Sequence, residues 1–226
     1  YIKEMIPIYD NVSPKIIMNI AGTDINEYVE IIEKVESVSS SITGYEINIS
    51  CPNVKKGGME FGVDAAMTEE LTAELRKRTN RLLIMKLSPN VSDIVSIGMS
   101  AQEAGADAVS AINTVVGMSI DSNSGKSNIY TTYGGLSGPA IKPVGLAAVH
   151  KLFQKLSSPI VGIGGIVSSK DVIEYVLAGS SAVQIGTANY RNPGTGENIV
   201  DQLNQEISDS KWESVKEMIG KVKTLS

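Results

Sequence analysis

The stretch at residues 44–62, GYEINISCPNVKKGGMEFG, joins a short apolar strand to a glycine-rich loop. Apolar and polar side chains alternate along the strand, so one face can be buried while the other can form hydrogen bonds. That polar face carries Glu46, Asn48 and Ser50. Pro52 has no N–H to give to a strand ladder, and three glycines let the segment after it bend. The sequence therefore places Asn48, Cys51 and Asn53 at the C-terminal end of one strand, beneath a loop that can close.

Six segments of strand character alternate with helical segments along the chain. The strands are expected at residues 15–21, 45–50, 82–88, 108–114, 159–164 and 182–187. The helices are expected at residues 25–40, 67–80, 92–105, 142–156, 169–178 and 197–224. Regular alternation of this kind predicts parallel βαβ units, and hence an α/β fold of the (β/α)8 TIM barrel class. The expected organisation is a single domain over residues 1–226 that carries six of the eight barrel units.

The two remaining units are expected before the first residue. Residues 1–8 read as the end of a helix, and a barrel that began there would leave the edge of its first strand unpaired. The longest irregular stretch, residues 117–138, is rich in Ser, Asn, Gly and Thr and is expected to be a loop or a small hairpin. It either shapes the site and contacts partners or is a solvated surface extension.

The composition excludes several classes of function. A net charge of −5 and a pI near 5.0 argue against binding to nucleic acid or to an anionic membrane surface. One cysteine cannot form an internal disulfide or hold an iron–sulfur cluster, and one histidine rules out a histidine-based metal site. The chain has no apolar run long enough to span a membrane and no signal-peptide pattern at residues 1–10, so a cytoplasmic location is expected.

Polar side chains recur at the C-terminal ends of the expected strands. They are Asn19, Asn48, Lys86, Asn113 and Thr114. Buried amide and ammonium groups need partners, and the ring edge of a flavin offers alternating donors and acceptors. Each residue taken alone is better explained by a hydrogen bond to a loop backbone, but five at one end favour a bound polar ligand.

The last two strands end in glycine. Residues 162–165 read GIGG, Gly186 precedes Thr187, and Gly138 lies on an earlier loop. Glycine lets backbone N–H groups approach a phosphate, and the loops after the last two strands form the usual phosphate site of such barrels. Tight strand–helix packing is the alternative explanation. The pattern is not a dinucleotide fingerprint, because Val167 stands where the third glycine would be.

Cys51 has two interpretations. A lone cysteine is most often a small buried thiol without a chemical role. Its place after a polar strand end and before Pro52 on a glycine-rich loop favours chemistry instead, because a modestly stabilised thiolate acts as a base.

The segment N-x-S-C-P-N-V-x-x-G-G at residues 48–58 resembles the active-site loop of class 1 dihydroorotate dehydrogenases, and its KKGG ending resembles the NAD-linked 1B subclass. The likeness continues through KLSPNV, AINTVVGMSID, GGLSGPAIKP, GIGGI and QIGTANY, in family order. Family members carry roughly eighty further residues at the N-terminus, which by resemblance hold two barrel strands, a lysine and a substrate loop.

The resemblance implies oxidation of dihydroorotate to orotate through FMN in pyrimidine biosynthesis, with Cys51 as the catalytic base. It places Asn48, Asn53, Asn113 and Thr114 against the substrate. It places Asn19, Asn48, Lys86, Ile112, Gly138, Gly164, Gly165, Gly186 and Thr187 against FMN.

The same resemblance implies a homodimer, alone or within a heterotetramer, whose second subunit carries FAD and an iron–sulfur cluster and passes electrons to NAD. Two alternatives stay open from the sequence: a fumarate-linked 1A enzyme, and a non-catalytic flavin-binding or assembly subunit that lacks the N-terminal substrate segment.

Overall fold

The computed structural model describes residues 3–12, 15–38, 41–49 and 61–223. The chain forms two compact units. The N-terminal unit comprises Tyr1–Leu87, Asp93–Ser110 and Leu156–Pro159. The C-terminal unit comprises Ser88–Ser92, Ala111–Lys155 and Ile160–Ser226. Each unit is described separately below.

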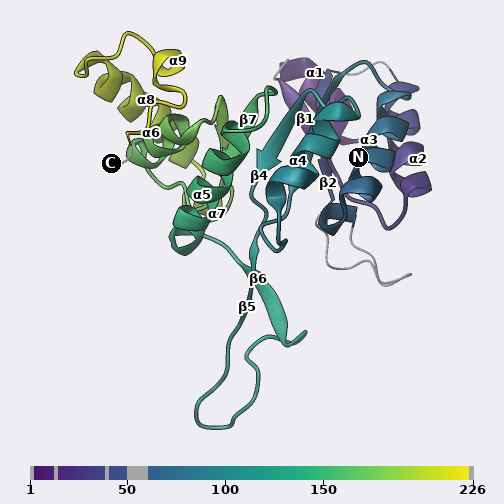
Figure 1. The fold of residues 1–226 in the computed structure, drawn as a ribbon, viewed down its shortest axis with the longest axis horizontal. Helices are drawn as coiled ribbons and strands as arrows, with labels where there is room; N and C mark the ends of the chain where they lie inside the picture. Colours follow the sequence, from purple (N-terminus) through teal and green to yellow (C-terminus); the bar gives the residue numbers. More distant parts are fainter. Residues whose placement is uncertain (1–2, 13–14, 39–40, 50–60, 224–226) are drawn as a thin grey trace. The chain divides into compact units, whose positions relative to one another are not determined.

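The N-terminal unit is a parallel sheet with the strand order β1-β2-β3-β4, and α2, α3 and α4 lie along it (Figure 1). Its elements are α1 (Met5–Val12), β1 (Ile16–Ile20), α2 (Ile25–Glu36), β2 (Ile42–Asn48), a 3-10 turn (Phe61–Val63), α3 (Ala65–Arg76), β3 (Leu82–Leu87), α4 (Ile94–Glu103) and β4 (Ala108–Ala111), whose last residue is counted with the C-terminal unit. The sheet is parallel because each strand is followed by a helix that returns the chain to the same edge.

The core of this unit lies where the sheet meets its helices. Side chains on both faces of β2 are buried, as expected for an inner parallel strand. In α2, Tyr28, Ile32 and Val35 recur at helical spacing and are all buried. The Asp24 side chain caps this helix by accepting a 3.0 Å hydrogen bond from the Glu27 N–H.

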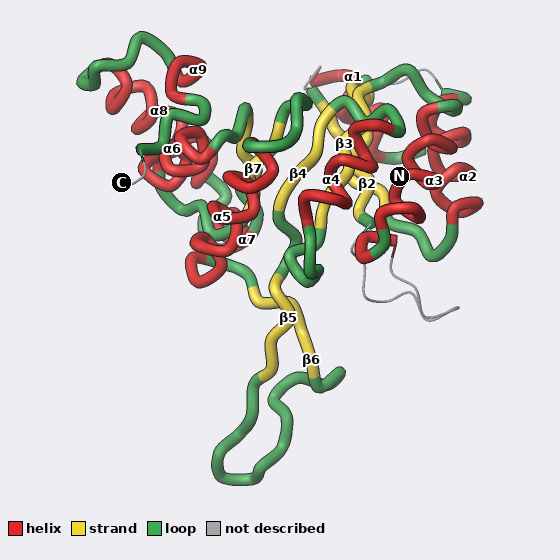
Figure 2. The backbone as a smooth tube through the Cα atoms, viewed as in Figure 1, coloured by secondary structure: helices red, strands yellow, loops and turns green. Residues whose placement is uncertain are grey.

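The C-terminal unit contains β7 paired in parallel with β8, with α5 packed against β7 and α6 packed against β8. Figure 2 shows α5, α6 and β7 in this unit. Its elements are β5 (Val115–Met118), β6 (Tyr133–Leu136), a 3-10 turn (Pro139–Ile141), α5 (Lys142–Phe153), β7 (Ile160–Ile163), α6 (Ser169–Ala178), β8 (Ala182–Gln184), α7 (Thr187–Arg191), α8 (Thr195–Ser208) and α9 (Val215–Met218). Each of the six expected strands is present, and each is followed by a helix.

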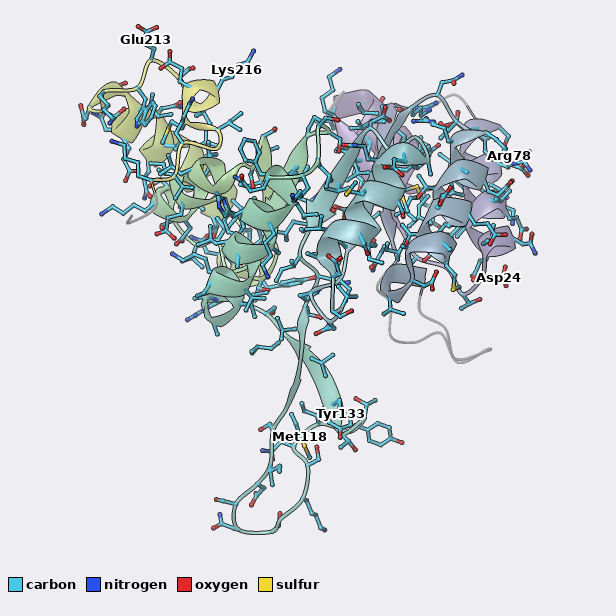
Figure 3. The ribbon with its side chains drawn as sticks, in the orientation of Figure 1. Asp24, Arg78, Met118, Tyr133, Glu213 and Lys216 are labelled. Carbon is cyan, nitrogen blue, oxygen red and sulfur yellow. The ribbon has the colours of Figure 1, made fainter. Side chains whose placement is uncertain are left out.

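The irregular stretch after β4 forms a small hairpin, one of the two forms that the sequence left open. Strands β5 and β6 pair antiparallel from Val115 opposite Leu136 to Met118 opposite Tyr133, and the ribbon extends away from the helices of its own unit (Figure 1). Figure 3 shows Met118 and Tyr133 together near the outer end of this ribbon, where both side chains are exposed.

The prediction of one continuous C-terminal helix over residues 197–224 is wrong. The chain instead forms α8 and α9, and Trp212 lies in the segment between them. The break has a local cause: the hydroxyls of Ser208 and Ser210 donate to the carbonyls of Asn204 and Ile207, and the Trp212 N–H donates to the Ser210 hydroxyl. Such side-chain bonds compete with the helical ladder. The sequence also missed α7 and the extension of α1 to Val12.

Gly179 ends α6 with a φ of 127°, a conformation that L side chains rarely adopt. A Cβ at this position would lie 2.3 Å from Cγ of Phe153. We expect Gly179→Ala to lower the free energy of unfolding by about 2–4 kcal/mol, from backbone strain plus overpacking. Denaturant unfolding measures this loss. Gly125→Ala is the control for strain alone, because its φ is 69° but a Cβ there would meet nothing within 4 Å. Equal losses in the two variants would contradict the packing explanation.

Candidate active site

Three side chains, one from each of β1, β3 and β4, surround the carboxylate of Glu46 on β2. Asn19 donates to one carboxylate oxygen at 2.6 Å, and the Ser110 hydroxyl donates to the other at 2.7 Å. The Lys86 ammonium lies 3.6 Å from the oxygen that Asn19 contacts. Asn19 and Glu46 are register partners on β1 and β2. We call Asn19, Glu46, Lys86 and Ser110 the Glu46 cluster.

The charge balance of this cluster depends on Glu46. Only 4% of the Glu46 surface is exposed, and a carboxylate buried to this extent requires a counter-charge and hydrogen-bond donors. Lys86 provides the counter-charge, and Asn19 and Ser110 are the donors. Because an ammonium carries three N–H donors, the ion pair leaves Lys86 with the capacity to bind another acceptor.

Glu46 was not predicted as a site residue. The sequence indicated that Asn19 and Lys86 need a polar partner, and in the structure this acidic side chain partners both. The available signal was the alternation in β2, which places Glu46 on the same face as Asn48.

Asn48 ends β2 and is half-buried, opposite Lys86 in the register of β2 and β3. Its backbone carbonyl accepts a 2.8 Å hydrogen bond from the buried hydroxyl of Tyr28. Asn48 and Lys86 are therefore direct neighbours across β2 and β3. Asn19 is connected to Lys86 through Glu46, which contacts both. Cys51 and Asn53 lie outside the described residues.

In the C-terminal unit, the residues that follow β4 are held by hydrogen bonds. The Ile112 N–H donates to the Ile163 carbonyl at 3.0 Å, and the Asn113 side-chain oxygen accepts from the Thr114 N–H at 2.8 Å. The Asn90 amide group donates to the Thr114 carbonyl at 3.0 Å. Ile112 is buried, while Asn113 and Thr114 are half-buried.

The predicted glycines gather at one place in the same unit. A Cβ on Gly165 would lie 2.8 Å from the Gly138 carbonyl oxygen, so these two loops touch. The Thr187 hydroxyl donates to the Ser137 hydroxyl at 2.9 Å, which places the start of α7 beside them. We call Gly138, Gly164, Gly165, Gly186 and Thr187 the glycine corner.

A buried acid fixes the turn that follows the glycine corner. One carboxylate oxygen of Asp171 accepts from the N–H groups of Val167 and Ser168, both at 2.9 Å, and the other lies 2.6 Å from the Lys142 ammonium. Burial alone would raise the pKa of Asp171, but these donors outweigh it and lower the pKa below its usual value. Lys142 also pairs with Glu174 at 2.9 Å, so its charge is balanced by two carboxylates.

The described residues hold neither a metal cluster nor a membrane span. No three His, Cys, Asp or Glu side chains among them are grouped so that they could hold a metal ion. No described helix combines the length and hydropathy of a membrane span.

The model of one protein family, described as Dihydroorotate dehydrogenase, matches residues 1–207. The chain belongs to the dihydroorotate dehydrogenase family. A protein of Citrifermentans bemidjiense named dihydroorotate dehydrogenase B (NAD(+)), catalytic subunit, is 41% identical over 220 residues, which are 97% of this chain and 72% of that protein. The protein of the same name from Malacoplasma penetrans is 45% identical over 86% of this chain and 63% of its own length.

A solved dihydroorotate dehydrogenase has a similar fold. The crystal structure of the Eimeria tenella enzyme in complex with ferulenol matches with a TM-score of 0.71 and 23% identity. The match covers 87% of this chain but only 57% of that one. The expected fold class is confirmed: the chain carries six strand–helix units of a (β/α)8 barrel fold.

Proposed function

We propose that this chain is an FMN-binding barrel domain over residues 1–226 that oxidises dihydroorotate to orotate in pyrimidine biosynthesis, as the catalytic subunit of an NAD-linked enzyme. The observation that carries the proposal is the 41% identity to a catalytic subunit of that name over 97% of the chain. The Glu46 cluster and the glycine corner add physical support, because they supply the two kinds of group that a flavin mononucleotide needs.

Each unit, taken by itself, offers groups that suit one polar part of FMN. Lys86 on β3 presents a cation that pairs with Glu46. Asn48 is an amide on the adjacent β2, and Asn19 is an amide on β1, which lies on the other side of β2. These three side chains would hold the edge of the flavin ring, and Ile112 would contact it. The backbone N–H groups of the glycine corner and the hydroxyl of Thr187 would hold the phosphate.

The substrate would be held by amide and hydroxyl groups. Asn48, Asn53, Asn113 and Thr114 read the carboxylate and ring amides of a pyrimidine without adding a competing base. The bound flavin supplies a two-electron acceptor for the hydride that leaves C6. Cys51 Sγ takes the proton from C5, so that the C5–C6 double bond forms and the electrons balance. Lys86 would hold the flavin through its ammonium and would place a positive charge beside the electron acceptor.

Electrons would leave through a partner. A second subunit carrying FAD and an iron–sulfur cluster would pass them to NAD, which agrees with a chain that has one cysteine and no dinucleotide fingerprint. We propose a cytoplasmic homodimer of this chain, alone or joined to two such subunits.

The electron acceptor that supports orotate formation distinguishes the NAD-linked function from the alternatives. The purified protein is supplied with FMN and dihydroorotate, and orotate is measured with NAD, with NAD plus the electron-transfer subunit of a 1B enzyme, and with fumarate. We expect NAD-linked orotate formation only when the second subunit is present. Turnover with fumarate alone would overturn the NAD-linked assignment, and a protein that binds flavin but forms no orotate with any acceptor would overturn the enzymatic one.

A further inference from the structure

Tyr175 of α6 is fully buried beneath the glycine corner. Its hydroxyl donates to the carbonyl oxygen of Gly164 at 2.8 Å and lies 3.2 Å from that of Ile163. The end of β7 is therefore fixed by a side chain from the following helix.

Glycines make room for this tyrosine. A Cβ at Gly145 would lie 2.0 Å from the Tyr175 hydroxyl oxygen, and a Cβ at Gly162 would lie 2.5 Å from its ring. Real Cβ atoms do not approach so closely, so any side chain at either position would displace the ring. The close packing of Tyr175 thus depends on two glycines outside the predicted cofactor set.

The hydroxyl of Tyr175 acts as a donor over the whole working pH range. Burial, reinforced by the negative charges of Asp171 and Glu174, raises the pKa of this hydroxyl far above its usual value. It therefore stays protonated and keeps its hydrogen bond to the Gly164 carbonyl.

This bond determines the direction of the next N–H group. The peptide between Gly164 and Gly165 is trans, so its C=O and N–H point in opposite directions. With the Gly164 carbonyl held by the Tyr175 hydroxyl, the Gly165 N–H points away from Tyr175. Gly164 and Gly165 have φ values of 131° and 71°, and a Gly–Gly peptide has little intrinsic preference for one orientation. The hydrogen bond from the Tyr175 hydroxyl is a restraint on this orientation that comes from another element, α6.

We propose that Tyr175 is a positioning residue that fixes the Gly164–Gly165 peptide so that the Gly165 N–H binds the phosphate of FMN. The inference rests on the proposed function, because it takes FMN as the ligand of the glycine corner. It adds a residue that does not touch the cofactor and acts only through the backbone it orients.

FMN differs from riboflavin only by its phosphate, so the difference between the two affinities measures what the phosphate contributes to binding. Flavin is removed from the protein, and both ligands are titrated by quenching of flavin fluorescence. We expect Tyr175→Phe to weaken FMN binding about tenfold, the loss typical of one hydrogen bond to a charged group, and to leave riboflavin binding unchanged. The matched control is Tyr28→Phe, which removes another buried tyrosine hydroxyl that donates to a strand-end carbonyl, that of Asn48. It should change both affinities equally.

The outcomes separate the inference from the proposed function. Equal weakening of FMN and riboflavin in Tyr175→Phe, or no change in either, would overturn the role of Tyr175 while leaving FMN as the cofactor. Failure of the unmodified protein to bind FMN would overturn both.

If Tyr175→Phe does not fold, the contact between the Gly165 N–H and the phosphate can still be tested in the unmodified protein. With ¹⁵N-glycine labelling, the Gly165 amide resonance should shift with FMN and not with riboflavin. A Gly165 resonance that responds equally to the two ligands would overturn the inference.

Discussion

Replacing Cys51 with serine should reduce dihydroorotate turnover by about 10²–10⁴-fold, the usual contribution of a general base. A serine hydroxyl is a far weaker base than a thiol near neutral pH, so the C5 proton would be removed slowly. The flavin should stay bound, because none of the groups assigned to FMN is changed. Single-turnover reduction of the flavin by dihydroorotate measures the effect directly.

The pH dependence provides the control for this variant. If the thiolate is the base, flavin reduction in the unmodified protein should rise with pH as the thiol ionises, and in Cys51→Ser that rise should move to higher pH. Asn53→Ala, in the same loop, should weaken substrate binding and leave the pH profile where it was. Turnover of Cys51→Ser equal to that of the unmodified protein would remove Cys51 from the mechanism.

Glu46→Gln should strongly destabilise the N-terminal unit. Glutamine keeps an oxygen for Asn19 or Ser110 but no charge, so Lys86 becomes a mostly buried cation without its counter-ion. Breaking a buried ion pair by removing one partner typically costs about 3–5 kcal/mol. Denaturant unfolding of the flavin-free protein measures this loss without reference to activity.

Two further variants test whether the loss of stability comes from the unpaired charge of Lys86. Glu30→Gln breaks the ion pair between Glu30 and Lys34, whose side chains are both 65% exposed, and should change stability little. The double variant Glu46→Gln/Lys86→Met removes both buried charges and should recover part of the loss, because no unpaired charge remains. A loss from Glu46→Gln as small as that from Glu30→Gln would mean that the Glu46 cluster does not determine the charge balance of the site.

The sequence predicted the elements with strong periodicity. The six strands, α6 and the hairpin after β4 could be predicted because alternation, helical spacing and turn-forming residues are local signals. The placement of Asn19 and Lys86 near the C-terminal ends of β1 and β3 followed from the same rule, since parallel strands end at one edge.

The partners of these residues could not be predicted. Glu46 joins Asn19 at a separation of 27 residues and Ser110 at a separation of 64, and only the register of the strands decides which side chains meet. Tyr175 reads in the sequence as an ordinary apolar position of α6, and its bond to Gly164 depends on the path of the chain after β7. The end of α8 was missed because serine hydroxyls, rather than a glycine or proline, stop the helix.

The visible absorption spectrum of the purified protein, recorded without oxygen before and after addition of dihydroorotate, tests the central claim most directly. We expect the bands of an oxidised flavin at first, then their loss on addition, with one orotate formed for each flavin reduced. A protein that cannot be loaded with FMN, or whose flavin bands persist in excess dihydroorotate, would contradict the account.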